Sequence, residues 1–485
     1  MKSLTKYIVI PCALALSVVG CAKFEDFGDT NISPNATELA STQALLTNAL
    51  LSVGSYSSET RGGLYAQHFS ETQYTETSLY QAPVLDFTAL YYGPIADLEK
   101  IIAFCSDPVT APRTAAYGLP QNQIAISRIV KAFYYWAATD KWGDLPYTEA
   151  LKAPSIMYPK YDTPEAIYKG VMQELTEAVD QLDLSANNVT GDVIAEGSSQ
   201  AASWARFANS LRMVIALRTS NVYPGASEWG AVEFKKAFEH SRGYIATNAQ
   251  NFNQKYDGDV VAYGNPWWSL FRTRSDYAVS DVFGEALVDV GDPRVSVVGS
   301  NTTFFPYGLT RNDAVTFTST VGGVYSVIWA PAYRQQSSTV PILTASQVAL
   351  TIAEAASLGW VSADATTWLK NGVTLGWSQY SVGGSLDVDD YLADVTAETG
   401  YTGAALIQYQ QWFSWYGNGL QAWSNWRRTR VPNLIPSPNA LSASGQIPER
   451  YQYPTTELNF NEENARLAFA KYNDNSPDVK LWWAK

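Results

Sequence analysis

Apolar residues spaced three and four apart run through much of the chain, and this spacing constrains the fold more than any other feature. In an α-helix, positions i, i+3, i+4 and i+7 share one face, so such a stripe predicts a helix that is buried on one side. Thr163, Pro164 and Glu165 supply a capping residue, a first-turn proline and an early acid, which is the chemistry of a helix start. The stripe that follows them is Ile167, Val171, Leu175, Ala178 and Leu182.

Similar stripes predict helices around residues 124–137, 204–215 and 406–413. The first of these stops before Gly143, and Thr344 and Gln347 have capping-box spacing before a further helix. Because helices recur along the chain in pairs, we expect a mainly α-helical fold built as a stacked array, without a repeat of fixed length.

Two long segments lack this periodicity. Between about 221 and 340 Gly, Pro, Asn and Ser are frequent, and the β-branched runs at 295–298 and 325–329 predict short strands. Residues 425–460 are irregular and rich in proline. Both segments are interleaved with the helices, so a single domain is predicted over 36–485. Long irregular segments on a rigid scaffold commonly carry binding.

Residues 1–20 have the form of a bacterial lipoprotein signal peptide. Lys2 and Lys6 precede a mostly apolar run at 7–19, and small residues lead up to Cys21. The run is too short for a comfortable transmembrane helix. We therefore expect 1–20 to be removed, Cys21 to be diacylated and 21–35 to form an extended tether. The alternative is an ordinary secretory signal with an incidental cysteine.

Charge and cysteine content narrow the class of partner. The formal net charge is −13 and there is no basic run, which argues against nucleic acid and against electrostatic adhesion to anionic lipid. The same acidity mildly disfavours polyanionic glycans. Beyond the leader only Cys21 and Cys105 remain, so no disulfide framework is expected. Cys105 lies in an apolar stretch and is predicted to be buried and unreactive.

Aromatic residues are abundant for a chain with so few charges. There are 16 Trp and 30 Tyr, whereas charged residues make up only 16%. Some of these rings are needed for the core, but Trp and Tyr also form flat surfaces that bind sugar rings or peptide side chains at low conformational cost.

Catalytic and metal-binding motifs are not evident in the sequence. The two histidines, His68 and His240, do not form a helical metal-ligand pair, and there is no H-E-x-x-H, G-x-S-x-G or P-loop. Asp387-Val388-Asp389-Asp390 resembles half of a calcium loop, but a solvated acidic turn is favoured because Tyr391 stands where a third acid is expected. We therefore predict a protein that is not an enzyme and that has no catalytic residues, cofactor or metal. A glycosidase pair among the many acids is the minority alternative.

DKWGDLPY at 140–147 resembles the end of a hallmark helix of the SusD/RagB family, and YDTP at 161–164 resembles that family's entry to the next helix. WARFANSLR at 204–212, DPR at 292–294 and AEAA at 353–356 match three further family motifs. WSNWRRT at 423–429 and IPER at 447–450 are similar to the branch called SusD-like outer-membrane lipoproteins. The motifs follow family order over nearly the whole chain.

The resemblance carries expectations about fold and function. It implies a scaffold of tetratricopeptide-like helix pairs with a less regular region beside it. It also implies an outer-membrane lipoprotein that faces the cell exterior. Such a protein forms a lid over a SusC-like TonB-dependent transporter and delivers a nutrient oligomer to it. The acidic stretch Lys23-Phe24-Glu25-Asp26 after the acylated cysteine resembles the surface-export signal of this family's bacteria. The ligand remains open between an oligosaccharide and, as in RagB-like proteins, a peptide.

The resemblance also places the ligand site in two regions, 67–92 and 263–334. Tyr80, Trp267 or Trp268, and Trp329 are predicted as stacking platforms, while Gln73 and Arg334 are predicted to supply hydrogen bonds. Trp329 shares a face with Tyr325 and Tyr333 at a spacing of four in a helix, and with Tyr325 in a strand. The alternative is that most of these rings pack inside. The full set of predicted ligand-binding residues is Gln73, Tyr74, Tyr80, Trp267, Trp268, Tyr325, Trp329, Tyr333 and Arg334.

Overall fold

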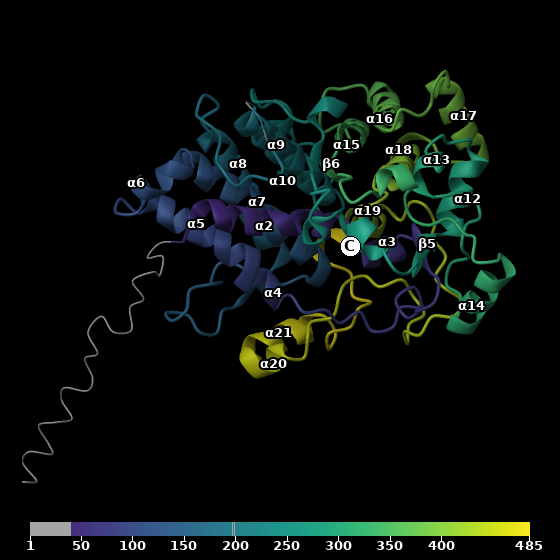
Figure 1. Ribbon diagram of the computed structural model, residues 1–485, viewed down its shortest axis with the longest axis horizontal. Helices are drawn as coiled ribbons and strands as arrows, with labels where there is room; N and C mark the ends of the chain where they lie inside the picture. The colour runs from purple at the N-terminus through teal and green to yellow at the C-terminus, as the bar shows by residue number, and fades with distance from the viewer. Residues whose placement is uncertain (1–39, 196, 198) are drawn as a thin grey trace, which may run out of the picture. The chain divides into compact units, whose positions relative to one another are not determined.

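The computed structural model describes residues 40–195, 197 and 199–485, and residues Thr42–Lys485 form one compact unit (Figure 1). The predicted signal peptide at 1–20, the acylated Cys21 and the tether at 21–35 lie outside the described residues.

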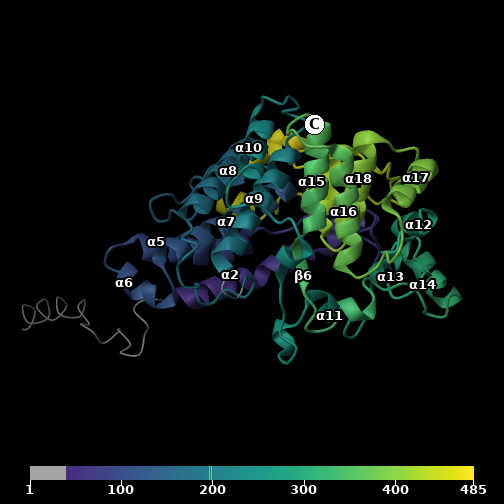
Figure 2. The same ribbon diagram turned by 90° about the horizontal axis from the view of Figure 1, so that it is seen from above.

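Helices make up most of this unit, as predicted. The long helices of the array are α2 (Thr42–Ser57), α5 (Ala96–Ser106), α7 (Pro120–Trp142), α8 (Pro164–Gln181), α9 (Gln200–Arg218), α10 (Trp229–Phe238), α15 (Ala345–Ser357), α16 (Ala365–Gln379), α18 (Gly403–Ser414) and α19 (Gly419–Thr429). They pack in sequence order, α5 on α7, α7 on α8, α8 on α9, α9 on α10 and α15, and α15 on α16 and α18. Figure 2 shows α8, α9 and α10 beside α15, α16 and α18.

The remaining elements are shorter or lie outside the array. The helices among them are α3 (Thr60–Tyr65), α4 (Thr88–Leu90), η3 (Tyr91–Ile95), α6 (Ala111–Thr114), η4 (Ala115–Tyr117), η5 (Asn248–Gln250), η6 (Val261–Tyr263), α11 (Pro266–Leu270), α12 (Asp281–Asp289), α13 (Val295–Val298), α14 (Arg311–Thr320), η7 (Pro331–Tyr333), α17 (Val388–Thr399), α20 (Glu457–Phe460), α21 (Glu462–Lys471) and η8 (Trp482–Ala484).

Three two-stranded antiparallel sheets tie distant parts of the described chain together. The strands are β1 (Phe69–Glu71), β2 (Leu145–Pro146), β3 (Tyr161–Asp162), β4 (Phe252–Gln254), β5 (Tyr277–Val279) and β6 (Val340–Leu343). They pair as β1–β5, β2–β3 and β4–β6, with Phe69 opposite Val279 and with a bulge in the third pair. The β1–β5 pair thus joins the irregular region to residues 69–71, and the β4–β6 pair joins two parts of that region to each other.

Helix ends follow the chemistry predicted from the sequence. The Thr163 hydroxyl accepts a hydrogen bond from the Ala166 amide at the start of α8. A capping box of Thr344 and Gln347 opens α15. Gly143 ends α7 at φ 95°, and an added Cβ there would lie 2.2 Å from the Tyr472 hydroxyl, so only glycine fits this close turn.

Helix α7 runs through the interior of the array. Of its 23 residues, 18 are buried, because α2, α5, α8, α9 and α19 all pack against it. Its predicted apolar stripe therefore covers only part of the buried surface. Cys105 on neighbouring α5 is buried as predicted, and burial raises the pKa of its thiol, which contacts Thr114.

Both strands predicted in the irregular region are wrong. Residues 295–298 form the short helix α13, because Asp292 accepts hydrogen bonds from the backbone and side chain of Arg294 and turns the chain into it. Residues 325–329 are not a strand either; in that run Ile328 alone makes an isolated bridge, to Gly299. Trp329 has φ 62°, which is incompatible with an extended strand. Local turn chemistry outweighs β-propensity at 295–298, and contacts with distant segments outweigh it at 325–329.

None of the helices among the described residues is both long and apolar enough to cross a bilayer.

Candidate functional site

An open cleft of about 410 Å³ lies where the irregular region meets the end of α16. We call it the outer cleft. η5, β4, α11, η7 and β6 supply the other walls. It is lined by Asn248, Asn251, Asn253, Trp267, Trp329, Ala332, Tyr333, Ser338, Thr339, Pro341, Ser378, Gln379 and Tyr380. No acid, base or histidine occurs among these described lining residues, so the cleft offers aromatic faces, amides and hydroxyls.

Trp267 is fixed in the cleft wall by a helix cap. The Asn265 side chain accepts hydrogen bonds from the backbone amides of Trp267 and Trp268, at 2.8 and 3.2 Å, and so starts α11. The Asn265 side-chain nitrogen donates to the Ser338 carbonyl, on another segment that lines the cleft. The Trp267 ring packs edge-on against Phe69 at 5.7 Å. The segment that carries Trp267 is therefore held both to the core and to the 338–341 segment.

Trp329 is held in an unfavourable backbone conformation. A φ of 62° is rare for a bulky residue and costs on the order of 1–3 kcal/mol, so the surroundings must impose it. The Trp329 amide donates to the Val298 carbonyl at 2.7 Å, and Arg334 Nε donates to the Trp329 carbonyl at 3.0 Å. The ring packs edge-on against Tyr416 at 4.8 Å. Strain of this kind gathers at functional sites.

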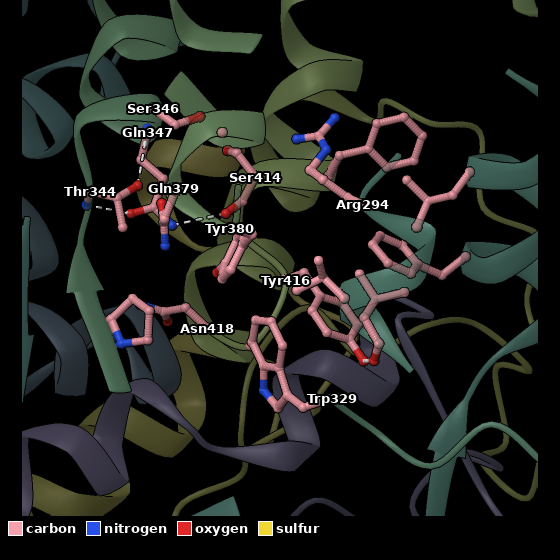
Figure 3. A pocket seen from close by; sticks show the side chains of 18 residues that line it. Arg294, Trp329, Thr344, Ser346, Gln347, Gln379, Tyr380, Ser414, Tyr416 and Asn418 are labelled. Carbon is pink, nitrogen blue, oxygen red and sulfur yellow. Dashed lines mark hydrogen bonds between the residues drawn. The ribbon is translucent and has the colours of Figure 1, made fainter. Parts of the chain in front are cut away.

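A small inner pocket of about 30 Å³ continues from the outer cleft towards the core. The two cavities share Trp329, Pro341, Gln379 and Tyr380. In Figure 3, Tyr380 lies between Thr344, Gln347 and Gln379 on one side and Tyr416 and Trp329 on the other. The capping residues of α15 form part of the polar wall, and Gln347 also donates to the Ser414 carbonyl at 2.9 Å.

Two tyrosines stand at the junction of the cavities. The Tyr333 hydroxyl donates to the Tyr380 carbonyl at 3.1 Å, and the two rings meet edge-on at 5.2 Å. Burial raises the pKa of Tyr380, so its phenol stays neutral at physiological pH. It can therefore donate as well as accept a hydrogen bond.

Two polar atoms of the cleft residues are left without a partner in the described structure. They are the indole Nε1 of Trp329, a residue only 5% exposed, and the Oδ1 of Asn253. A buried unpaired donor or acceptor costs about 1–3 kcal/mol. Both atoms belong to residues that line the outer cleft, and both atoms are themselves buried.

A charged residue lies beneath the inner pocket, but its charge is largely balanced. Arg294 donates through Nε and Nη2 to Asp292, and Nη2 also donates to Gln410. Burial alone would lower the pKa of Arg294, but the adjacent Asp292 carboxylate outweighs it and raises the pKa. This DPR motif therefore supports the pocket floor.

The structure brings together three of the nine predicted ligand-binding residues. Trp267, Trp329 and Tyr333 line the outer cleft. Arg334 lies directly behind Trp329, with its guanidinium 5.4 Å from the Phe271 ring centre. Trp267 is buried and Trp268 beside it is partly exposed.

Two predicted binding residues pack in the interior and do not line the outer cleft. Tyr80 is completely buried, and its hydroxyl accepts a hydrogen bond from the Ser437 amide and contacts the Tyr307 hydroxyl. Tyr325 packs with Phe305 in a small separate cluster, and its hydroxyl donates to the Ser275 carbonyl. Each hydroxyl finds its partner inside the protein, which a polar sequence context does not reveal.

The other two predicted residues, Gln73 and Tyr74, are exposed and do not line the outer cleft. Conversely, sequence reasoning missed Tyr380, Gln379 and the asparagines of the cleft. The spacing Asn248-x-x-Asn251-x-Asn253 was a usable signal, since three amides within six residues of an irregular region are ready hydrogen-bonding groups. Tyr380 ends α16 and had no comparable signal.

Motif residues outside the cleft serve the fold. Arg428 forms a buried two-pronged ion pair with Glu354, at 2.7 Å for each contact. Asp387 caps α17 through the amides of Asp389 and Asp390. Among the described residues no three His, Cys, Asp or Glu side chains gather as metal ligands would.

A family profile described as "Starch-binding associating with outer membrane" matches residues 34–454. The chain belongs to the SusD-like family. The resemblance found in the sequence motifs is thereby confirmed. A comparison with curated proteins found no match.

Solved structures agree with this assignment. A chitin-binding protein is 25% identical, with a TM-score of 0.75, over 91% of this chain and 99% of that one. A SusD homologue from Bacteroides uniformis is 22% identical, with a TM-score of 0.78, over 92% and 99%. A chitin-binding SusD homologue from Flavobacterium johnsoniae is 19% identical, with a TM-score of 0.71, over 92% and 98%. The fold is therefore the tetratricopeptide-like helical scaffold of SusD-like proteins.

Proposed function

We propose that this SusD-like protein is a lipid-anchored, surface-facing binding protein that captures an oligosaccharide in the outer cleft and delivers it to a SusC-like TonB-dependent transporter. The observation that carries the proposal is the lining of the cleft, which pairs aromatic rings with neutral amides and hydroxyls. Sugar rings offer apolar faces for stacking and hydroxyl groups for hydrogen bonds. The family description and the two chitin-binding relatives support a glycan over a peptide.

The same lining supports binding without catalysis. Glycoside hydrolysis uses a pair of carboxylic acids on either side of the scissile bond. The described lining of the outer cleft contains no carboxylate. A ligand held there keeps its glycosidic bonds and can be passed on intact.

Calorimetry on the full chain in a nonionic detergent tests the ligand class. We expect binding of at least one neutral oligosaccharide series, such as chito-, malto- or cello-oligosaccharides. Trp329→Ala should weaken this binding about five- to a hundred-fold, since a stacking ring contributes on the order of 1–3 kcal/mol by analogy with base–aromatic stacking. Gln379→Ala removes a partly exposed amide and should weaken it without changing the melting temperature.

Tyr158→Ala is the matched control, because Tyr158 is 67% exposed and lies outside the cleft. If the protein binds a peptide mixture and no oligosaccharide, its ligand is a peptide and not a glycan. If both cleft variants bind oligosaccharide like the wild-type protein, the binding site is not the outer cleft.

The transporter is tested separately, by purification from native membranes in mild detergent. A β-barrel protein of TonB-dependent transporter size should co-purify with the lipoprotein. Repeated recovery of the lipoprotein alone would contradict the delivery step but would leave the binding measurement intact.

A further inference from the structure

Three exposed arginines lie over aromatic rings on the surface next to α11. The guanidinium of Arg272 lies 5.2 Å from the Trp268 ring centre. Those of Arg274 and Arg311 lie 5.2 and 5.0 Å from the ring centre of Tyr74. We call these five residues the arginine surface. Tyr74 and Trp268 were predicted as ligand-binding residues. In the structure, arginine guanidinium groups lie over both rings.

The fold holds this surface together from three distant segments. Pairing of β1 with β5 is prolonged by a hydrogen bond from the Thr72 amide to the Asp276 carbonyl, which brings Tyr74 alongside Arg274. Helix α14 begins at Arg311 and packs on β5 through Ala314 and Ala278. Figure 1 shows α14 near β5. The fold thus places Arg274 and Arg311 close to the Tyr74 ring.

The charges of this surface are only partly balanced. Arg274 forms an ion pair with Asp276. The guanidinium groups of Arg272 and Arg311 form no ion pair or hydrogen bond with any described residue, and each lies over one aromatic ring. Arg274 and Arg311 share one ring, so their guanidinium carbons are no more than about 10 Å apart. Exposed like charges repel each other only weakly at such a distance, and a bound anion would supply the counter-charge that Arg272 and Arg311 lack.

Stacking also prepares these arginines for binding. A guanidinium that lies over an aromatic ring has lost part of its rotational freedom before a ligand arrives. Its planar fork then fits the two oxygens of a carboxylate or a sulfate. A solvated lysine on a flexible stem would offer neither advantage.

We propose that the arginine surface binds an anionic group on the glycan, either the carboxylate of a uronic acid or a sulfate ester. This inference rests on the proposed glycan-binding function and specifies its substrate class. Trp267 and Trp268 are consecutive in α11, and the first lines the neutral outer cleft while the second carries Arg272. A glycan chain with neutral and acidic units therefore finds a surface of each kind on one short helix.

The overall acidity of the chain does not prevent this. The net charge of −13 acts on an approaching polyanion from a distance, but salt screens it beyond about 8 Å at physiological ionic strength. Within that range Arg272 and Arg311 contribute positive charge that no described ion pair balances. The predicted mild preference against polyanionic glycans applies to long-range approach and not to this surface.

The test is calorimetry on the full chain in nonionic detergent with three probes: an oligogalacturonate, a sulfated galactan oligosaccharide and a neutral galactan oligosaccharide of equal length. We expect an acidic probe to bind at least about tenfold more tightly than the neutral one, with affinity that falls as salt rises. Arg274→Gln and Arg311→Gln should each remove about tenfold of the acidic-probe affinity, as charge-assisted hydrogen bonds do. Arg311→Lys keeps the positive charge but loses the planar guanidinium. Its affinity for the acidic probe should lie between those of Arg311→Gln and the wild-type protein.

Arg466→Gln is the control for charge, because Arg466 is an exposed arginine on α21 that pairs with Glu462. It should change no affinity. Preference for oligogalacturonate assigns the anion as a carboxylate, and preference for the galactan sulfate assigns it as a sulfate. Equal affinity for all three probes, or acidic-probe binding that is unchanged in both glutamine variants, overturns the inference. In that event, binding of neutral oligosaccharides that depends on Trp329 would still uphold the proposed function. Loss of binding to every glycan would overturn both.

Discussion

The Trp329 ring packs directly against the backbone of Gly417. Gly417 has φ 82°, and a Cβ added there would lie 2.4 Å from the Trp329 ring. Gly417→Ala must therefore displace the ring, in addition to straining the backbone. We predict that this substitution weakens oligosaccharide binding at least about fivefold and lowers the melting temperature. Calorimetry and thermal unfolding measure the two effects.

Gly400→Ala is the control, because it strains the backbone without a steric clash between the new Cβ and a side chain. Gly400 caps α17 at φ 71° with open space around it. Its replacement should lower the melting temperature by strain alone and leave binding unchanged. If Gly417→Ala binds oligosaccharide like the wild-type protein, the ring of Trp329 does not contribute to the site.

His68 makes the folded state sensitive to acid. It is completely buried among Phe283, Trp412 and Tyr416, and burial lowers its pKa to about 3. The unfolded chain has a histidine pKa near 6.5, so between these two values the unfolded state binds more protons. The free energy of unfolding therefore falls as pH drops below about 6.5, by about 1.4 kcal/mol per pH unit.

Urea unfolding at pH 6.5 and pH 5 measures this effect. The wild-type protein should lose about 2 kcal/mol more than His68→Leu over this interval. His240→Leu removes the partly exposed histidine and should keep the wild-type slope. Parallel pH profiles for wild type and His68→Leu would show that His68 is not the source.

At the scale of elements, the Glu354–Arg428 pair fastens α15 to α19. Both side chains are almost fully buried. Burial would raise the pKa of Glu354, but the Arg428 guanidinium and hydrogen bonds from Gln408 and Gln411 outweigh it and lower the pKa. Glu354→Gln would leave a buried guanidinium without its counter-charge, which costs about 3–5 kcal/mol. We predict a loss of that size in chemical unfolding.

An exposed pair supplies the comparison. Glu462→Gln breaks the Glu462–Arg466 pair on α21, where both side chains are more than half exposed. Such pairs contribute about 0–1 kcal/mol. Equal losses in the two variants would mean that the buried pair has no special role in joining the helices.

Elements with local signals were predictable and elements shaped by distant contacts were not. The start of α8 at Thr163 and that of α15 at Thr344 follow from capping chemistry within four residues. The run at 325–329 has strand propensity, but the positive φ of Trp329 is imposed by Val298, Arg334 and Gly417. No pattern within that run contains this information.

The candidate site shows the same division. Aromatic content and an irregular region pointed to Trp267, Trp329 and Tyr333, which meet in the cleft. Tyr80 had the same polar context and is buried, because Ser437, far along the chain, supplies its partner. Which tyrosines face a ligand is decided by contacts between segments more than 200 residues apart in sequence.

At the scale of the whole molecule, we expect attachment to the membrane to depend on Cys21. No helix within residues 40–485 that the structure describes can span a bilayer. We predict that Cys21→Ala releases the protein from membranes, because diacylation supplies the apolar area that holds it there. Detergent phase partitioning measures this. Retention of the Cys21→Ala protein in the detergent phase would show that another segment anchors it.

The enclosure of α7 has a consequence for how the molecule fluctuates. Five helices surround α7, and every residue from 132 to 142 is buried. The amide hydrogens of 132–142 should therefore exchange with deuterium mainly by global unfolding. The η7 turn beside the cleft, which is mostly exposed, should exchange by local opening alone. A ligand in the cleft would then slow exchange in η7 far more than in α7, and the ratio of the two rates would report occupancy of the cleft separately from stability of the fold.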